Sequence, residues 1–209
     1  GTQLLDLVAN ALSAEAVQKE RSFFKGMLGK GVASAAVTLH DDPLLADGLA
    51  SSAFDDEGVS HAALVPIRAG VLSEYFYDLR SAARDGRDSN GRGSKGGLGA
   101  PPHPSSTNLF IAAGKTAVAD MLASEPRVFL LREVMGLHMA DPITGEFSLG
   151  GSGYLYENGK YAGPVRGVTI AGSVGGMLKA ISAVGPDLTW YGAVGAPSLL
   201  VTGLTIAGS

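Results

Sequence analysis

The hydrophobic pattern of the chain begins with a stripe at helical spacing. Leu4, Leu5, Val8, Ala11 and Leu12 recur every three to four residues, the spacing that places side chains on one face of an α-helix. We therefore predict a helix from Leu4 to about Phe24, with its apolar face in the core and a break near Ser13-Ala14-Glu15.

The next patterns are typical of strands. Residues 32–39 alternate weakly and end at His40-Asp41-Asp42-Pro43, where the proline disfavours helical geometry at the residue before it. Residues 63–67 and 71–77 are two apolar segments joined by Arg68-Ala69-Gly70. This arrangement predicts a β-hairpin.

A second hairpin has a stronger turn signal. Residues 153–156 and 160–162 flank Glu157-Asn158-Gly159, and Asn-Gly readily adopts the positive φ angles of a tight hairpin turn. Both hairpins are rich in apolar residues and turn on a glycine. An internal duplication is therefore possible, on the evidence of two short segments.

The rest of the chain mixes loops, strands and helices. Residues 84–106 hold many glycines and prolines and almost nothing apolar, which predicts a flexible loop. Further on, Ser173 is placed to cap a helix that Gly185-Pro186 would stop. The other predicted elements are strands at 108–111, 128–131, 198–201 and 204–206, a helix at 116–124, and Met177, Leu178, Ile181 and Val184 on the capped helix. Strands grouped in antiparallel hairpins with interspersed helices indicate an α+β fold with hairpin-rich sheets and a few packed helices.

Composition narrows the classes of function. The 209 residues are 45% hydrophobic, enough to bury a substantial core, and the net charge of −4 provides no basic face for direct nucleic-acid binding. No apolar run reaches membrane-spanning length, so no membrane partner is expected and the cytoplasm is the default location. The absence of cysteine excludes disulfides, thiolate nucleophiles and cysteine zinc ligands.

The first helix has the frame of a two-histidine metal site without the histidines. Zinc needs side chains that offer a lone pair, and Leu5 has none, Asn10 is a poor donor, and Asp6 alone keeps acid–base character. We therefore predict no metal ligand here, no resident cofactor, and a core-facing helix.

The other polar clusters have simple structural interpretations. His40, His61, His103 and His138 lie at no short metal-ligand spacing from one another. His40-Asp41-Asp42 could bind a cation but more readily forms a polar turn, and Asp55-Asp56-Glu57 most readily caps a turn. If the fold buried a carboxylate pair among Asp41, Asp42, Asp55, Asp56 and Glu57, it could serve acid–base chemistry.

Two further motifs lack the context that their chemistry requires. Gly91-Arg92-Gly93-Ser94-Lys95-Gly96 matches the dinucleotide-binding glycine pattern, but no strand precedes it and no helix follows it. The basic residues Arg84, Arg87, Arg92 and Lys95 are therefore expected in a solvated linker. Ala171-Gly172-Ser173-Val174-Gly175 narrowly misses the nucleophile-elbow pattern, and a cap explains Ser173 without chemistry.

A set of segments spread over nearly the whole chain resembles the C-terminal half of the TldD/PmbA family. They are residues 39–43, 48–51, 54–59, 107–109, 141–148, 156–159, 169–172 and 197–201. The resemblance implies a peptidase built from two related subunits, which degrades unfolded peptides or matures peptide precursors. In it, TldD carries zinc on a His-Glu-x-x-x-His helix with a further cysteine ligand. The corresponding positions here are Leu5, Asp6 and Asn10, so the resemblance is to the TldE (PmbA) side, and no zinc-ligand role carries over.

The resemblance implies further expectations. Residues 1–209 would be a C-terminal domain from which an N-terminal domain is missing, and it would pair with a TldD-like zinc peptidase subunit to enclose an extended peptide, or form a homodimer in isolation. An exposed sheet edge suits that role because it can pair with a substrate backbone. The alternatives are an autonomous hydrolase with a carboxylate site, and an adaptor that modulates DNA gyrase.

Overall fold

The computed structural model describes residues 2–136 and 140–208. Within them the helices are α1 (Thr2–Ala11), α2 (Ala14–Gln18), α3 (Leu79–Arg84), α4 (Val118–Ala123) and α5 (Val174–Lys179). The strands are β1 (Leu39–Asp41), β2 (Leu64–Arg68), β3 (Val71–Leu72), β4 (Gly93–Ser94), β5 (His103–Pro104), β6 (Leu109–Ile111), β7 (Arg127–Met135), β8 (Glu146–Glu157), β9 (Lys160–Ser173), β10 (Ile181–Val184), β11 (Thr189–Tyr191), β12 (Val194–Ala196), β13 (Leu199–Val201) and β14 (Thr205–Ala207). The predicted α+β class is confirmed.

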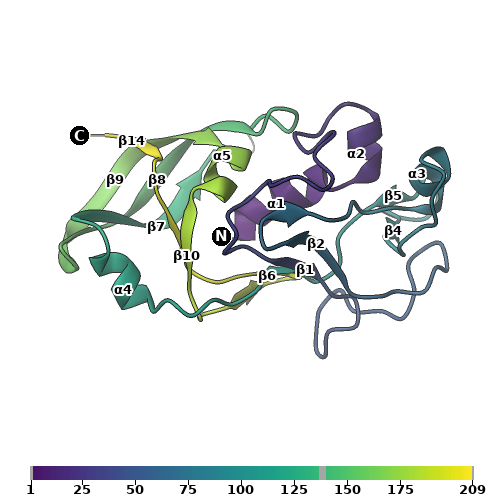
Figure 1. The fold of residues 1–209 in the computed structure, drawn as a ribbon, viewed down its shortest axis with the longest axis horizontal. Coiled ribbons are helices and arrows are strands. Elements are labelled where there is room, and N and C mark those ends of the chain that lie inside the picture. The colour runs from purple at the N-terminus through teal and green to yellow at the C-terminus, as the bar shows by residue number, and fades with distance from the viewer. Residues whose placement is uncertain (1, 137–139, 209) are drawn as a thin grey trace.

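Two larger sheets and two small ones make up the fold. The six-stranded sheet has the order β11-β12-β6-β1-β2-β3, and the four-stranded sheet has the order β14-β9-β8-β7. The strand pairs are antiparallel except that β12 runs parallel to β6. Figure 1 shows the long β7–β9 ribbons at one end of the molecule and α2, α3, β4 and β5 at the other, with α1 between them.

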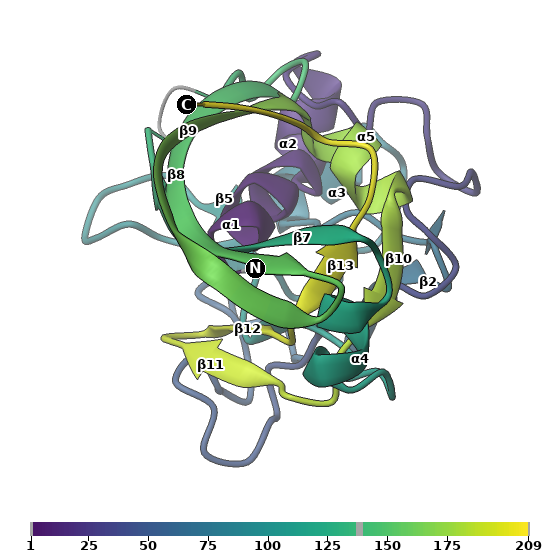
Figure 2. The ribbon, with the colours of Figure 1, turned by 90° about the vertical axis from the view of Figure 1, so that its left-hand side faces the viewer.

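The four-stranded sheet is strongly curved. Figure 2 shows β8 and β9 curling through a wide arc, with the N-terminal end of α1 inside the curl in this view. The β8–β9 hairpin turns at Asn158 and Gly159, both with positive φ (48° and 76°), so the predicted turn is confirmed and its strands are longer than expected. The β2–β3 hairpin is also confirmed. The two hairpins lie in different sheets and differ in strand length, and an internal duplication stays a prediction.

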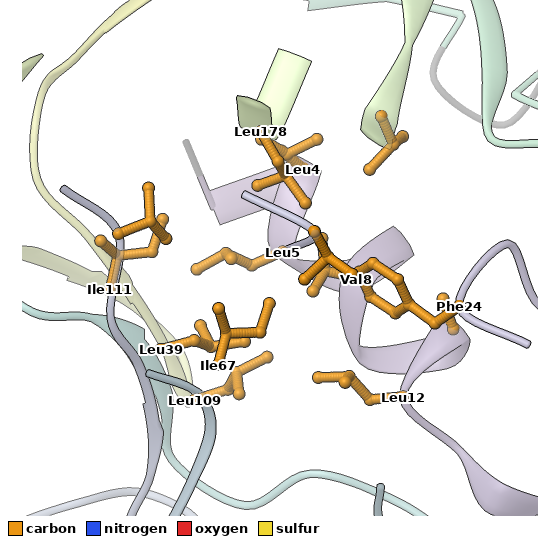
Figure 3. Close-up of a cluster of buried hydrophobic side chains, with 14 of the residues drawn as sticks. Leu4, Leu5, Val8, Leu12, Phe24, Leu39, Ile67, Leu109, Ile111 and Leu178 are labelled. Carbon is orange, nitrogen blue, oxygen red and sulfur yellow. The ribbon is translucent and has the colours of Figure 1, made fainter. Parts of the chain in front are cut away.

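The core forms around α1. Leu4, Leu5, Val8 and Leu12 are buried, and Figure 3 shows them with side chains from β1, β2 and β6. The predicted helical stripe and the break at Ser13 are therefore confirmed, with the Ser13 side chain capping α2. No helix in the described part of the chain is long and apolar enough to cross a membrane.

Several predicted boundaries were wrong. Helix α2 ends at Gln18 rather than near Phe24, because Lys19 closes the helix and Glu20 takes a positive φ of 59°. Residues 32–38 are not a strand, since the amides of Val32 and Ala33 both bond to the Gly70 carbonyl in a loop.

Two more boundaries depended on pairing that lies far away in the sequence. Ile181 and Val184 do not continue the helix capped by Ser173; they form β10, which pairs with β13. Residues 73–77 do not extend the second strand of the first hairpin, because β3 ends at Leu72.

Candidate functional site

The three positions of α1 that the resemblance compares with a zinc-binding helix, Leu5, Asp6 and Asn10, are split between core and solvent. Leu5 is only 1% exposed, and Figure 3 shows its side chain directed toward Leu39 and Ile111 in the apolar cluster. Positions five apart on an α-helix lie about 140° apart around its axis, so Asn10 points elsewhere, into solvent. Position 5 in this chain therefore serves packing.

Asp6 and Asn10 do not form a zinc-binding site. Asp6 and Asn10 are exposed and lie one turn apart, and desolvation by the protein around it raises the pKa of Asp6 above its ordinary value of 3.8. No cluster of three or more His, Asp or Glu side chains within residues 2–136 and 140–208 is arranged to hold a metal. Zinc requires three or four lone-pair donors, so the residues present do not fit the ion.

Asp41, the last residue of β1, is fully buried. Asp41 forms an ion pair with Arg92, whose Nε lies 2.5 Å from its Oδ2, and it accepts hydrogen bonds from the amide and hydroxyl of Thr107 at 2.7 and 3.0 Å. Burial raises the pKa of Asp41, and the positive charge of Arg92 opposes that rise. His40 and Asp41 thus lie in a strand rather than in the predicted polar turn, and Asp41 forms a structural ion pair.

Arg92 was predicted to be a solvated linker residue, and that prediction was wrong. Its guanidinium is buried and also donates to the carbonyls of Ala62, Asn90 and Gly91 at 2.8 to 3.0 Å. The glycine-rich motif is thus built around this buried cation, and Gly93–Ser94 pairs with His103–Pro104 as a short antiparallel ladder. Flexibility of residues 84–106 stays a prediction for the parts away from Arg92.

The second acidic cluster holds backbone in place. Asp55 accepts from the amides of Glu57, Val59 and Gly93 at 2.8 to 2.9 Å, which confirms the predicted turn cap. Asp56 accepts from the Lys95 amide, and Glu57 accepts from the amide of Leu79 at the start of α3. These carboxylates attach residues 84–106 and α3 to the rest of the protein.

The histidines lie in separate places. His40 stacks on Phe110, with ring centroids 5.1 Å apart, and desolvation lowers its pKa. His61 Nδ1 lies 2.9 Å from the Ser52 carbonyl oxygen, and His103 is exposed on β5. His138 lies outside the described residues.

Ser173 has the predicted capping role. Its hydroxyl accepts from the Gly176 amide at 3.1 Å at the start of α5. The hydroxyl has no histidine partner among its hydrogen bonds in the described part of the chain, so this serine is not arranged as a nucleophile.

A hollow between α1 and the curved sheet was not predicted. It measures about 800 Å³ and is lined mainly by apolar side chains, including Leu4 and Leu7 of α1, Phe129 of β7 and Leu200 of β13. Strand β7 is an edge of its sheet, because it pairs with β8 on one side only. A hollow beside an unpaired edge can receive an extended chain, with backbone groups on the strand and side chains in the hollow. The sequence predicted only residues 128–131 of β7 as a strand, and so short a segment does not show which strand lies at the edge of a sheet.

A family model and several curated relatives match the chain. The model described as the PmbA/TldA metallopeptidase C-terminal domain matches residues 1–208. An uncharacterized protein of Methanocaldococcus jannaschii is 35% identical over 81% of this chain and 39% of its own length. Metalloprotease PmbA of Escherichia coli O157:H7 is 30% identical over 99% of this chain and 44% of its own length, and a metalloprotease TldD homolog of Buchnera aphidicola is 29% identical over 100% and 46%. The chain thus spans less than half the length of these relatives.

Solved structures agree with these matches. A Thermotoga maritima protein described as a candidate modulator of a DNA gyrase superposes with a TM-score of 0.90 at 35% identity, over 99% of this chain and 47% of that one. TldE from Thermococcus kodakarensis superposes with a TM-score of 0.87 at 27% identity, over 96% of this chain and 46% of that one.

Proposed function

The chain belongs to the PmbA/TldD metallopeptidase family, and on that premise we propose that it is the C-terminal domain of a TldE (PmbA)-like subunit that does not cut peptides by itself. The observation that carries this proposal is the position of Leu5. A leucine that is 1% exposed stands where the first metal ligand of the family's zinc helix would be, and its side chain is part of the core.

The neighbouring residues support the same conclusion. Asn10 is exposed on another side of α1, and the chain contains no cysteine that could complete a metal shell. A bound metal ion lowers the pKa of its water ligand and so supplies a hydroxide nucleophile at neutral pH, and these residues do not provide its ligands. The catalytic zinc site therefore belongs to a TldD-like partner subunit, in the cytoplasm.

The contribution of this domain is to hold substrate. The hollow of about 800 Å³ and the unpaired edge of β7 are adjacent, and β7 lines the hollow along most of its length. An extended or unfolded peptide would add to β7 as a further strand, with its main chain giving affinity and its apolar side chains entering the hollow. This mode of binding is tolerant of sequence, which suits a peptidase of unfolded peptides.

The proposal is tested by activity and metal content. Three samples are purified: the full subunit alone, its TldD-like partner alone, and the two together. Each sample is assayed for cleavage of an unfolded peptide and for bound zinc. We expect cleavage and stoichiometric zinc only where the partner is present. Equal cleavage by the subunit alone, or one zinc per subunit, would overturn the proposal.

The carboxylate alternative is tested in the same assay. Asp56→Asn and Glu57→Gln change the carboxylates of the second acidic cluster that are least buried there, and each accepts a backbone hydrogen bond in the structure. If the subunit were an autonomous hydrolase using this cluster, cleavage by the subunit alone would be present and would fall in these variants.

A second candidate function is modulation of DNA gyrase, which is favoured by the description of the Thermotoga structure. With a net charge of −4, the chain would act on the gyrase protein rather than on DNA. A change in gyrase supercoiling rate on addition of the purified subunit, absent when the partner peptidase is added alone, would support this candidate.

A further inference from the structure

Two β-bulges face each other across the middle of the four-stranded sheet. Between β7 and β8, Leu131 pairs with Gly153 and Glu133 with Ser152, so Arg132 is an extra residue in β7. Between β8 and β9, Gly153 pairs with Val165 and Gly151 with Val168, so Arg166 and Gly167 both lie opposite Ser152. Ser152 on the central strand is therefore flanked on both sides by a bulge that contains an arginine.

Bulges change the direction of a side chain, and here they bring two cations to one place. Arg132 and Arg166 line the same surface hollow of about 420 Å³, together with Ser152, Glu133 and Tyr154. A regular ladder would alternate side chains between the two faces of the sheet, whereas a bulged strand bends and can direct successive side chains differently. The same device in both neighbouring strands indicates a built feature of this surface.

The charges of the hollow favour an anion. Neither guanidinium forms an ion pair with a carboxylate anywhere in residues 2–136 and 140–208. The single carboxylate of the lining, Glu133, already accepts a hydrogen bond from the Ser152 hydroxyl at 2.9 Å. Two arginines against one glutamate leave the hollow with one excess positive charge at neutral pH.

From this geometry we propose that the Arg132–Arg166 hollow is a binding site for a carboxylate of a peptide, at its C-terminus or on an acidic side chain. Guanidinium groups present paired N–H donors that match the two oxygens of a carboxylate. Tyr154, two residues from Ser152 on the same face of β8, lines the hollow and supplies an aromatic surface beside the anion. The assignment to a peptide rests on the proposed function, because Arg132 lies on β7, the edge strand proposed to pair with substrate.

The test compares two labelled peptides of equal length by fluorescence anisotropy with the full chain at low salt. One peptide carries glutamates and a free C-terminal carboxylate; the other carries glutamines and a C-terminal amide. We expect the acidic peptide to bind about tenfold more tightly, and Arg132→Gln or Arg166→Gln to remove most of that preference, as expected for loss of a charged hydrogen bond. Arg132→Lys keeps the charge but not the paired donors, and should restore only part of the preference.

The matched control is Arg84→Gln, which makes the same charge change at an exposed position on α3, away from the hollow. An equal loss of preference in Arg84→Gln would show a general charge effect and overturn the inference. If inorganic phosphate displaces the acidic peptide at concentrations at which acetate does not, the site is one for free phosphate. That result would also overturn the inference.

The two proposals fail in different ways. If both peptides bind equally well and the arginine variants change nothing, the carboxylate site is wrong while peptide binding along β7 stands. If neither peptide binds, peptide holding itself is wrong, and the inference falls with it.

Discussion

Arg92 provides the most direct test of how the glycine-rich segment is held. The substitution Arg92→Gln removes a guanidinium that is fully buried together with Asp41 and that donates to the carbonyls of Ala62, Asn90 and Gly91. Glutamine is too short to reach all of these acceptors. Asp41 would remain as a buried carboxylate with Thr107 as its main hydrogen-bond partner.

The expected loss of stability is large. Removing one member of a buried ion pair costs about 3 to 5 kcal/mol, because the other charge is left uncompensated. For a domain of this size each kcal/mol lowers the melting temperature by about 2 to 4 °C, so the melting temperature should fall by about 6 to 20 °C. Circular dichroism during thermal and urea unfolding measures both quantities. Arg84→Gln, at an exposed position in the same segment, should change the stability by less than about 0.5 kcal/mol.

The pH dependence distinguishes loss of the ion pair from loss of packing. Burial already raises the pKa of Asp41 above 3.8, and loss of Arg92 would raise it further. An acid whose pKa is raised in the folded state binds more protons there than in the unfolded state, so stability falls as the pH rises through that window. The loss of unfolding free energy in Arg92→Gln, relative to the unsubstituted protein, should therefore be small below about pH 4 and should grow toward neutral pH. A deficit below about 1 kcal/mol, or one that does not change with pH, would refute this reasoning.

Substitutions at three other positions test parts of the structure. Leu5→Ala should destabilise the chain by about 2 to 5 kcal/mol in urea unfolding because it leaves a cavity beside α1, and an unchanged stability would contradict the core position of this residue. Ser173→Ala should cost about 1 kcal/mol through the lost cap of α5, with Ser173→Asp retaining stability; peptidase activity of the complex should be unchanged, and its loss in both variants would indicate a chemical role. Gly153→Ala would place a Cβ 2.0 Å from the Leu130 carbonyl oxygen, so we expect a loss of about 1 to 3 kcal/mol and faster amide hydrogen exchange in β7, and normal exchange there would contradict the β7–β8 register.

Local patterns predicted the elements whose signals are local. The stripe of α1, the Asn158-Gly159 turn and the Ser173 cap each depend on residues within a few positions of one another, and all three appear in the structure. The family resemblance also came from the sequence, and the match of the family model to residues 1–208 confirms it. The sequence shows directly that position 5 is a leucine without a metal-binding lone pair, whereas the burial of this leucine is visible only in the structure.

The features that were missed depend on distant partners. Arg92 looks like one more basic residue in a polar segment, and its burial follows from Asp41, which lies 51 positions earlier in the chain. Ile181 and Val184 continue a helical pattern, but pairing with β13 makes them a strand. The bulges at Arg132 and Arg166 are defined by the register of three strands. That register depends on pairing between distant residues, so a short stretch of sequence does not reveal it.

The arrangement of the last strands has a consequence for synthesis. Residues 189–207 supply β11 and β12 to the six-stranded sheet, β13 to the two-stranded sheet with β10, and β14 to the four-stranded sheet. Each of these three sheets therefore stays incomplete while the ribosome is still adding that stretch. Nascent chains that lack it would present open strand edges and uncovered apolar surface, which make a chain prone to aggregation until these strands are added.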